Sequence, residues 1–264
     1  MAELKIPIDW APRPYQRAAW DAFRTRSFDR GALVWHRRAG KDLFALNLIA
    51  TQLFQRVGTY WHILPTYRQG SKAVWNGKTR DGRAFLSHLP MQMADRVRDD
   101  EMTIWFKNPV DPNMSGSIYQ VVGADDPDRL MGANPVGVVF SEWALMQRRV
   151  WEFIRPILVE NGGWALFIYT PRGKNHGHTL YQRALTNPSW FAQLLTIEDT
   201  KAVSLEDVEE ERLAGMPEAL IQQEFYCSFN AALEGSYYGD QMTWLRAQDP
   251  PRIGKVPWDP RVPV

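Results

Sequence analysis

Short apolar runs that alternate with longer helical stretches constrain the fold of this chain most strongly. The apolar runs cover residues 32–36, 60–64, 137–140 and 164–169, and they consist mainly of aliphatic and aromatic side chains. Continuous apolar runs of this length are typical of strands that are buried on both faces. Strands separated by helices imply a mostly parallel sheet with helices on both sides. The sequence therefore predicts an α/β fold.

The stretches between these runs show where the helices lie. Residues 42–56 place apolar side chains at helical spacing, residues 69–75 can open a helix, and residues 148–160 predict another. Residues 102–107 and 117–122 predict a pair of strands joined by a segment rich in turn residues. The predicted sheet thus has helices on both sides and one added strand pair.

The composition changes near residue 200. Ser204 and Asp207 have the spacing of a capping box, and Pro217 stands where a second helix can begin. Beyond residue 233 the chain is rich in Gly, Pro and Asp and shows little periodicity. We predict a core over residues 1–200, a small helical lid over 201–232, and a linker or the start of another domain over 233–264.

Composition excludes several classes of protein. The formal net charge is +1, so any nucleic-acid surface must be a local patch. The single cysteine, Cys227, rules out an internal disulfide framework. No apolar run reaches the roughly 20 residues of a membrane span, and we expect no membrane association. The 12 tryptophans are scattered, which favours core packing over a base-stacking platform.

The segment WHRRAGKD lies between the first predicted strand and its helix, where a phosphate-binding loop is found in nucleotide-binding folds. Gly40 lets the backbone approach a phosphate, and Lys41 can reach the β- and γ-phosphates. Trp35 and Asp42 depart from the usual G-x-x-x-x-G-K-[ST] pattern. A surface Gly-Lys turn at a helix start is the alternative.

The apolar strand 137–140 ends in Ser141 and Glu142. In a phosphate-loop ATPase an Asp at the first position binds Mg²⁺ and a Glu at the second orients water. Here the loop carries a carboxylate, Asp42, where a hydroxyl is usual, and the strand carries a hydroxyl where a carboxylate is usual. We predict that Asp42 and Ser141 exchange roles across one Mg²⁺ ion, and that Glu142 is the catalytic carboxylate.

Three further segments supply candidate site residues. Thr170 follows the strand 164–169, where a hydroxyl can contact water or the γ-phosphate, while His176 and His178 fit solvated loop residues better than metal ligands. Gln16 could read the adenine edge, or it could serve helix packing. Arg129 could be an arginine finger, a role for which Arg37 and Arg38 compete; each of the three could instead form a surface ion pair.

The ordered set HRRAGKD, DRLMGANPVGVVFSEWA, YTPRGKNHGHTLY and QEFYCSFNAALEGSYYG resembles the large terminase subunit of tailed phages. The resemblance covers about residues 12–239. It implies a RecA-like phosphate-loop ATPase core with a helical lid subdomain, and ATP and Mg²⁺ as cofactors. In this resemblance residues 37–42 (Arg37, Arg38, Ala39, Gly40, Lys41 and Asp42) form the nucleotide loop, Glu142 is the catalytic glutamate, Thr170 belongs to the coupling motif, and Arg129 acts in trans.

The resemblance also implies what the molecule works with. It implies a motor that drives double-stranded DNA into a procapsid, as a homo-oligomeric ring that meets a portal protein and a small terminase subunit. The expected location is the host cytoplasm, outside the mature virion. In the family a nuclease domain follows, and this sequence stops at Val264, about where that domain should begin. We therefore expect no nuclease activity, and we expect Asp240, Asp249 and Asp259 not to be nuclease ligands. A helicase-like DNA-dependent ATPase and a non-catalytic nucleotide-binding scaffold remain the alternatives.

Overall fold

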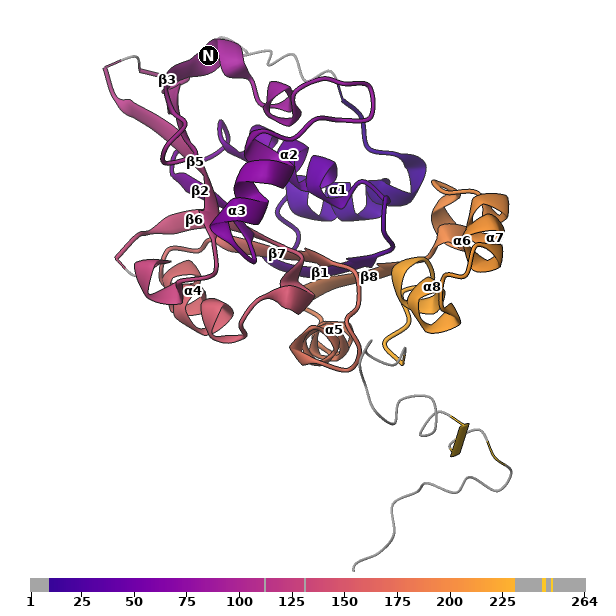
Figure 1. The fold of residues 1–264 in the computed structure, drawn as a ribbon. Coiled ribbons are helices and arrows are strands. Elements are labelled where there is room, and N and C mark those ends of the chain that lie inside the picture. Colours follow the sequence, from indigo (N-terminus) through magenta and orange to yellow (C-terminus); the bar gives the residue numbers. More distant parts are fainter. Residues whose placement is uncertain (1–9, 112, 131, 231–243, 246–247, 249–264) are drawn as a thin grey trace, which may run out of the picture.

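An eight-stranded sheet forms the centre of the molecule (Figure 1), in the strand order β3-β4-β5-β2-β6-β7-β1-β8. This computed structural model describes residues 10–111, 113–130, 132–230, 244–245 and 248. The strands are β1 (Arg30–Trp35), β2 (Thr59–Leu64), β3 (Ala94–Arg98), β4 (Thr103–Lys107), β5 (Ser115–Gly123), β6 (Pro135–Ser141), β7 (Trp164–Tyr169) and β8 (Trp190–Leu195).

The sheet is mostly parallel, as predicted. Strand β1 runs parallel to β7 and β8, β2 runs parallel to β5 and β6, and β6 runs parallel to β7. Only the edge is antiparallel, where β3 pairs with β4 and β4 pairs with β5. The predicted strand pair over 102–107 and 117–122 is confirmed as β4 and β5.

Helices cover both faces of the sheet (Figure 1). Helices α1 (Arg17–Arg24), α2 (Lys41–Gln52) and α3 (Tyr67–Gly70) lie on one face, and α4 (Arg149–Glu160) and α5 (His176–Thr186) lie on the other. Alternate residues of β7 show the two cores: Leu166 packs in the cluster that contains Phe44 of α2, and Phe167 packs in the cluster that contains Ile154 of α4. Burial on both faces explains why the central strands are continuous apolar runs.

The helices α6 (Ile197–Thr200), α7 (Leu205–Leu213) and α8 (Glu218–Glu224) form a group of their own beside β8 (Figure 1). Ile197, Val208 and Ile221 make its small apolar cluster. The Ser204 side chain accepts a hydrogen bond from the Asp207 N–H, so the predicted capping box is present. This group, called the lid below, already includes α6, whereas we predicted its start at residue 201; the domain boundaries stay predictions.

Several elements differ from the sequence prediction. Helix α5 begins at His176, inside a segment predicted as a loop, because the Asn175 side chain accepts a hydrogen bond from the Gly177 N–H and starts the helix. Helix α3 ends at Gly70 and continues as a π-helical turn over Ser71–Trp75. Helix α1 and strands β3 and β8 were not predicted. The predicted linker 233–264 lies outside the described residues, apart from residues 244–245 and 248.

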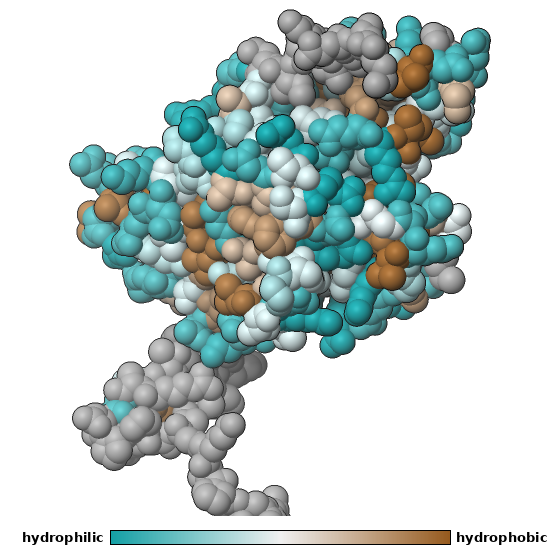
Figure 2. Space-filling model, turned by 180° about the vertical axis from the view of Figure 1, so that it is seen from behind, coloured by the Kyte–Doolittle hydropathy of each residue, from teal (hydrophilic) through white to brown (hydrophobic). Residues whose placement is uncertain are grey.

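The face opposite to that of Figure 1 is mostly hydrophilic (Figure 2). Hydrophobic residues gather in a patch near its centre and in smaller groups elsewhere. No helix in the described part of the chain combines the length and apolarity needed to cross a bilayer. Trp35, Trp143 and Trp164 are among the largest fully buried side chains, in agreement with the predicted core packing, whereas Trp244 is 58% exposed.

Candidate active site

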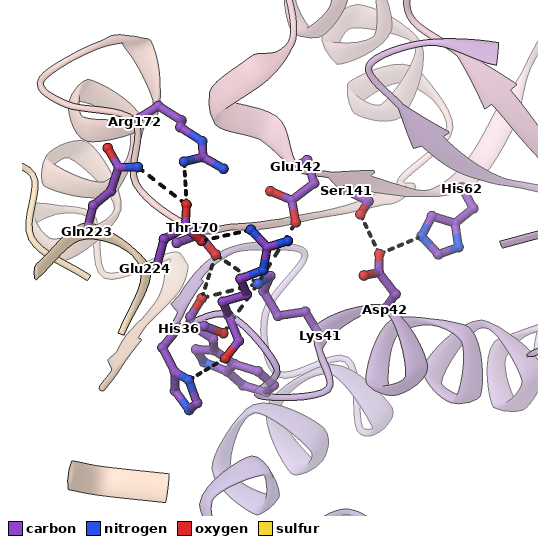
Figure 3. Close-up of polar contacts among 12 residues, drawn as sticks. His36, Lys41, Asp42, His62, Ser141, Glu142, Thr170, Arg172, Gln223 and Glu224 are labelled. Carbon is purple, nitrogen blue, oxygen red and sulfur yellow. Dashed lines mark hydrogen bonds and ion pairs between the residues drawn. The ribbon is translucent and has the colours of Figure 1, made fainter. Parts of the chain in front are cut away.

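Three neighbouring strands end at the same edge of the sheet and deliver the candidate residues there. In the sheet β6, β7 and β1 are adjacent, and the register pairs Ser141 with Ile168 and Val34 with Tyr169. The loop after β1, Glu142 after β6 and Thr170 after β7 therefore meet (Figure 3). Ligand sites of parallel sheets lie at this carboxyl edge.

The loop between β1 and α2 has the backbone of an anion site. Gly40 is the N-cap of α2 and has a φ of 80°, in the left-handed region that favours glycine. Arg38 is also left-handed, with a φ of 71°. The first N–H groups of a helix have no partner inside it and carry a partial positive charge. The turn therefore offers donors to an anion at the start of α2.

The Lys41 side chain points back across this turn and is buried. Its Nζ donates to Thr170 Oγ1 at 2.9 Å and to the carbonyl oxygens of Trp35 and His36 at 3.3 and 3.4 Å. Thr170 Oγ1 donates in turn to the Trp35 carbonyl at 3.2 Å. The loop and the segment after β7 are thus joined through one ammonium group.

Glu142 faces this ammonium group, with its Oε1 4.0 Å from Lys41 Nζ. Its φ is 56°, a left-handed conformation that costs a non-glycine residue about 1–3 kcal/mol and is common at functional sites. Burial raises the pKa of the Glu142 carboxyl, and the nearby Lys41 opposes that rise. A carboxylate in this setting accepts a proton more readily than an ordinary glutamate.

Asp42 and Ser141, predicted to share one ion, touch each other. Ser141 Oγ donates a hydrogen bond to Asp42 Oδ1 (Figure 3). His62 Nε2, on β2, lies 3.6 Å from the same oxygen, and Tyr119 Oη lies 3.3 Å from His62 Nδ1. Burial would raise the pKa of Asp42, but the contacts with His62 and Ser141 outweigh it and lower that pKa. Asp42 is therefore an ionised carboxylate beside the Ser141 hydroxyl, and its oxygens can act as ligands.

The Gln16 side chain contacts the backbone of the loop. Its Nε2 donates to the Ala39 carbonyl at 3.1 Å, and Tyr15 Oη donates to the same carbonyl at 3.1 Å. A cavity of about 550 Å³ lies beside this contact, and its lining includes Trp10, Gln16 and Gly40. The predicted role of Gln16 in reading adenine stays a prediction.

The three candidate arginines differ in their settings. Arg37 Nη1 lies 3.5 Å from the buried carboxylate of Glu224 in α8, and the Arg37 N–H donates to the Glu224 carbonyl at 2.8 Å. Arg38 is exposed. Arg129 lies in the short helix Pro127–Leu130, and its side chain falls outside what the structure describes. Which arginine is a finger stays a prediction.

Sequence reasoning missed three polar residues of this edge. Arg172 donates to Glu224 Oε1 and comes two positions after Thr170, so its place after β7 was a usable signal. His62 was hidden inside an apolar strand, and Glu224 lies in the lid, where no sequence pattern ties it to the loop. All three are drawn in Figure 3.

His36, His176 and His178 make contacts within the fold. His36 Nδ1 lies 2.6 Å from the Arg37 carbonyl and therefore donates, so Nε2 accepts from Thr200 Oγ1 at 2.6 Å. His176 and His178, predicted as solvated, are only partly exposed: His176 Nε2 bonds the Trp143 carbonyl at 2.9 Å, and His178 packs on Phe229. Within the described ranges, no three His, Cys, Asp or Glu side chains gather as a metal cluster.

Comparison with known proteins finds sequence similarity to the large terminase subunits of phages. The large terminase subunit of Thermus phage G20c is 32% identical over 148 residues, which are 53% of this chain and 30% of that protein. That of Escherichia phage T5 is 29% identical over 208 residues, 76% of this chain and 44% of that protein. Over these stretches the chain is similar in sequence to phage large terminase subunits. It spans less than half the length of these terminase relatives, and no protein-family model matches it.

The fold is that of the large terminase ATPase domain. The ATPase domain of the Thermus phage P74-26 large terminase matches with a TM-score of 0.68 and 23% identity, over 84% of this chain and 95% of that domain. The large terminase of another thermophilic bacteriophage, in complex with ADP, matches with a TM-score of 0.66 and 15% identity, over 83% of this chain and 54% of that terminase. The predicted α/β core is confirmed.

Proposed function

We propose that this chain is the ATP-hydrolysing motor domain of a phage large terminase, which drives double-stranded DNA into a procapsid. The observation that carries the proposal is the meeting of Lys41, Glu142 and Thr170 at the carboxyl edge of the sheet, on a left-handed turn that opens a helix. A terminase of the same fold supports the proposal, because it was solved both with ADP and with ATP-gamma-S.

Each residue has a role in this proposal. The N–H groups of Gly40, Lys41 and Asp42, where α2 begins, and the ammonium group of Lys41 bind the phosphates, and the positive end of α2 adds to the field. Glu142 holds a water in line with the γ-phosphate and polarises it. Thr170 contacts Lys41 directly, so it senses whether the ammonium group is engaged by phosphate.

The donor set of Asp42 and Ser141 fits Mg²⁺. The ion prefers oxygen ligands and takes one or two carboxylates together with phosphate and water oxygens. Here one ionised carboxylate and one hydroxyl already touch each other beside the loop. Asp42 and Ser141 would hold the ion, which neutralises phosphate charge when it is bound.

The proposal includes partners that belong to the whole machine. We infer a homo-oligomeric ring around DNA, in contact with a portal protein and a small terminase subunit, in the cytoplasm of the infected host. An arginine finger from a neighbouring copy, with Arg129, Arg37 or Arg38 as candidates, would complete the transition-state charge.

The test is Mg²⁺-dependent ATP hydrolysis by the purified chain, with and without duplex DNA. Lys41→Ala should lower the rate roughly a hundredfold or more, since it removes a cation that acts on the transferred phosphate. Lys107→Ala is the control, because Lys107 is an exposed lysine at the end of β4. Nucleotide binding without hydrolysis would favour the scaffold alternative, and strand displacement would favour a helicase.

A further inference from the structure

A buried carboxylate of the lid holds two arginines at the candidate phosphate site. Glu224 is only 3% exposed. Its Oε1 accepts from Arg172 (Figure 3). Its Oε2 lies 3.5 Å from Arg37 Nη1. The neighbouring Gln223 Nε2 donates to the same Oε1 at 3.4 Å. One positive group of the loop and one that follows β7 are therefore paired with a single anion of the lid.

The contacts at this edge join its charged side chains in three groups. Lys41 faces Glu142, Asp42 faces Ser141 and His62, and Arg37 and Arg172 face Glu224. Arg172 comes two positions after Thr170, whose Oγ1 accepts from Lys41 Nζ at 2.9 Å, and Lys41 Nζ lies 4.0 Å from Glu142 Oε1. These groups therefore lie within electrostatic range of the water-activating carboxylate and belong to one site.

A bound polyphosphate adds negative charge to this set. Phosphate oxygens are strong, often bidentate acceptors for arginine. Arg172 is 27% exposed and Arg37 is 61% exposed, so both guanidinium groups can turn toward a ligand, whereas the Glu224 side chain is 4% exposed and fixed in the lid. The γ-phosphate and Glu224 thus compete for the same donors.

We infer that Arg172 is a phosphate-binding residue of the nucleotide site, and that Glu224 is the internal anion that occupies it until a triphosphate arrives. The inference rests on the proposed function, because it takes the ligand to be a nucleoside triphosphate. Since α8 carries Glu224, the transfer of Arg172 to phosphate also loosens one tie between the lid and the sheet.

The test measures the dissociation constants of ATP-gamma-S and ADP, with Mg²⁺, for the unmodified chain and its variants. Glu224→Gln should bind ATP-gamma-S about tenfold more tightly, because the competing charge is gone, and should change ADP binding less. Arg172→Gln should weaken ATP-gamma-S binding about tenfold, again with a smaller change for ADP. In the double variant the gain from Glu224→Gln should disappear.

Glu218→Gln is the matched control. Glu218 lies on the same helix and pairs with an arginine, Arg212, at 2.8 Å, but on an exposed surface of the lid. Its removal should leave both dissociation constants unchanged. The ratio of the ADP to the ATP-gamma-S constant is an internal measure for each variant, and thermal unfolding checks that each variant is folded.

The outcomes separate the two claims. A purely structural Glu224 would make Glu224→Gln weaken both ligands or change neither, and either result overturns the inference alone. An unchanged ratio in Arg172→Gln overturns it as well. If the unmodified chain binds neither nucleotide, the proposed function fails and the inference fails with it.

Discussion

The proposed ion site consists of two residues, Asp42 and Ser141, that are both unusual at their positions. Each departs from the residue expected at its position, yet the Ser141 hydroxyl donates directly to the Asp42 carboxylate. An ion between them would meet the same two oxygen types as in a site with the hydroxyl on the loop and the carboxylate on the strand. Only Asp42 and Ser141 together would supply both oxygen types.

This pairing predicts the result of an exchange. Asp42→Ala should lower Mg²⁺-dependent ATP hydrolysis roughly a hundredfold or more, because it removes the carboxylate that we propose as a ligand of the ion. Asp42→Thr combined with Ser141→Asp should recover about tenfold of that loss. Hydrolysis rates at several Mg²⁺ concentrations measure both effects, and Asp42→Thr alone should stay inactive. A fully active Asp42→Ala variant would contradict the shared-ion hypothesis.

Glu142 predicts a pH dependence. Only the ionised carboxylate can polarise water, and burial raises its pKa, so the rate should fall on acidification at a higher pH than an ordinary glutamate allows, whose pKa is about 4.3. Glu142→Gln should retain nucleotide binding and lose roughly a hundredfold in rate. Single-turnover hydrolysis across pH measures this, with circular dichroism to show that the fold persists. A rate that is flat down to pH of about 4 would count against the assignment.

Among the elements, the packing of β6 against two aromatic rings requires a glycine at position 137. A Cβ at Gly137 would lie 2.6 Å from ring atoms of both Trp164 and Tyr60, and neither buried ring has room to move. Gly137→Ala should therefore lower the free energy of unfolding by about 1–3 kcal/mol, measured by urea denaturation.

The comparison for this variant is Gly82→Ala. Nothing lies within 4 Å of a Cβ there, so only the left-handed backbone, with a φ of 83°, opposes the alanine. That conformation costs roughly 1–2 kcal/mol. Strong destabilisation by Gly137→Ala with retained hydrolysis would show that β6 is held by packing rather than by the site. No loss of stability would mean that the rings yield.

The elements with strong periodicity were predictable, and those that depend on tertiary contacts were not. The buried runs of β1, β2, β6 and β7 were recognised because burial on both faces leaves a continuous apolar signature. Strand β8 was missed because its residues are mostly half-buried, and α5 was hidden by polar residues whose helix start needs the Asn175 cap.

The same division applies to the site. Lys41, Glu142 and Thr170 were found because each follows a strand, and parallel strands end together. Arg172 and Glu224 meet only because the lid folds back on the loop, where the Arg37 N–H donates to the Glu224 carbonyl. No local pattern encodes that return. The contact of His62 with Asp42 likewise arises from the neighbouring positions of β2 and β6.

For the whole molecule, the site predicts that nucleotide stabilises the fold. A ligand at a hundred times its dissociation constant adds about 2.7 kcal/mol to the free energy of unfolding. For a domain of this size that corresponds to roughly 5 to 10 °C in melting temperature. Differential scanning fluorimetry with Mg·ADP measures the shift. Lys41→Ala should abolish it, and an equal shift in that variant would place the ligand elsewhere.

The position of β1 in the sheet has a consequence for how the chain folds during synthesis. Arg30 pairs with Ala165 on one side and with Trp190 on the other. A ribosome therefore releases β1 and its loop long before the flanking strands exist, and the apolar strand must wait with open edges. The hydrogen bonds from His36 to Leu195 and from Arg37 to Glu224 can form only after those later residues have emerged. We expect protection by chaperones during that interval to matter more to this chain than to one whose strands pair in the order of synthesis.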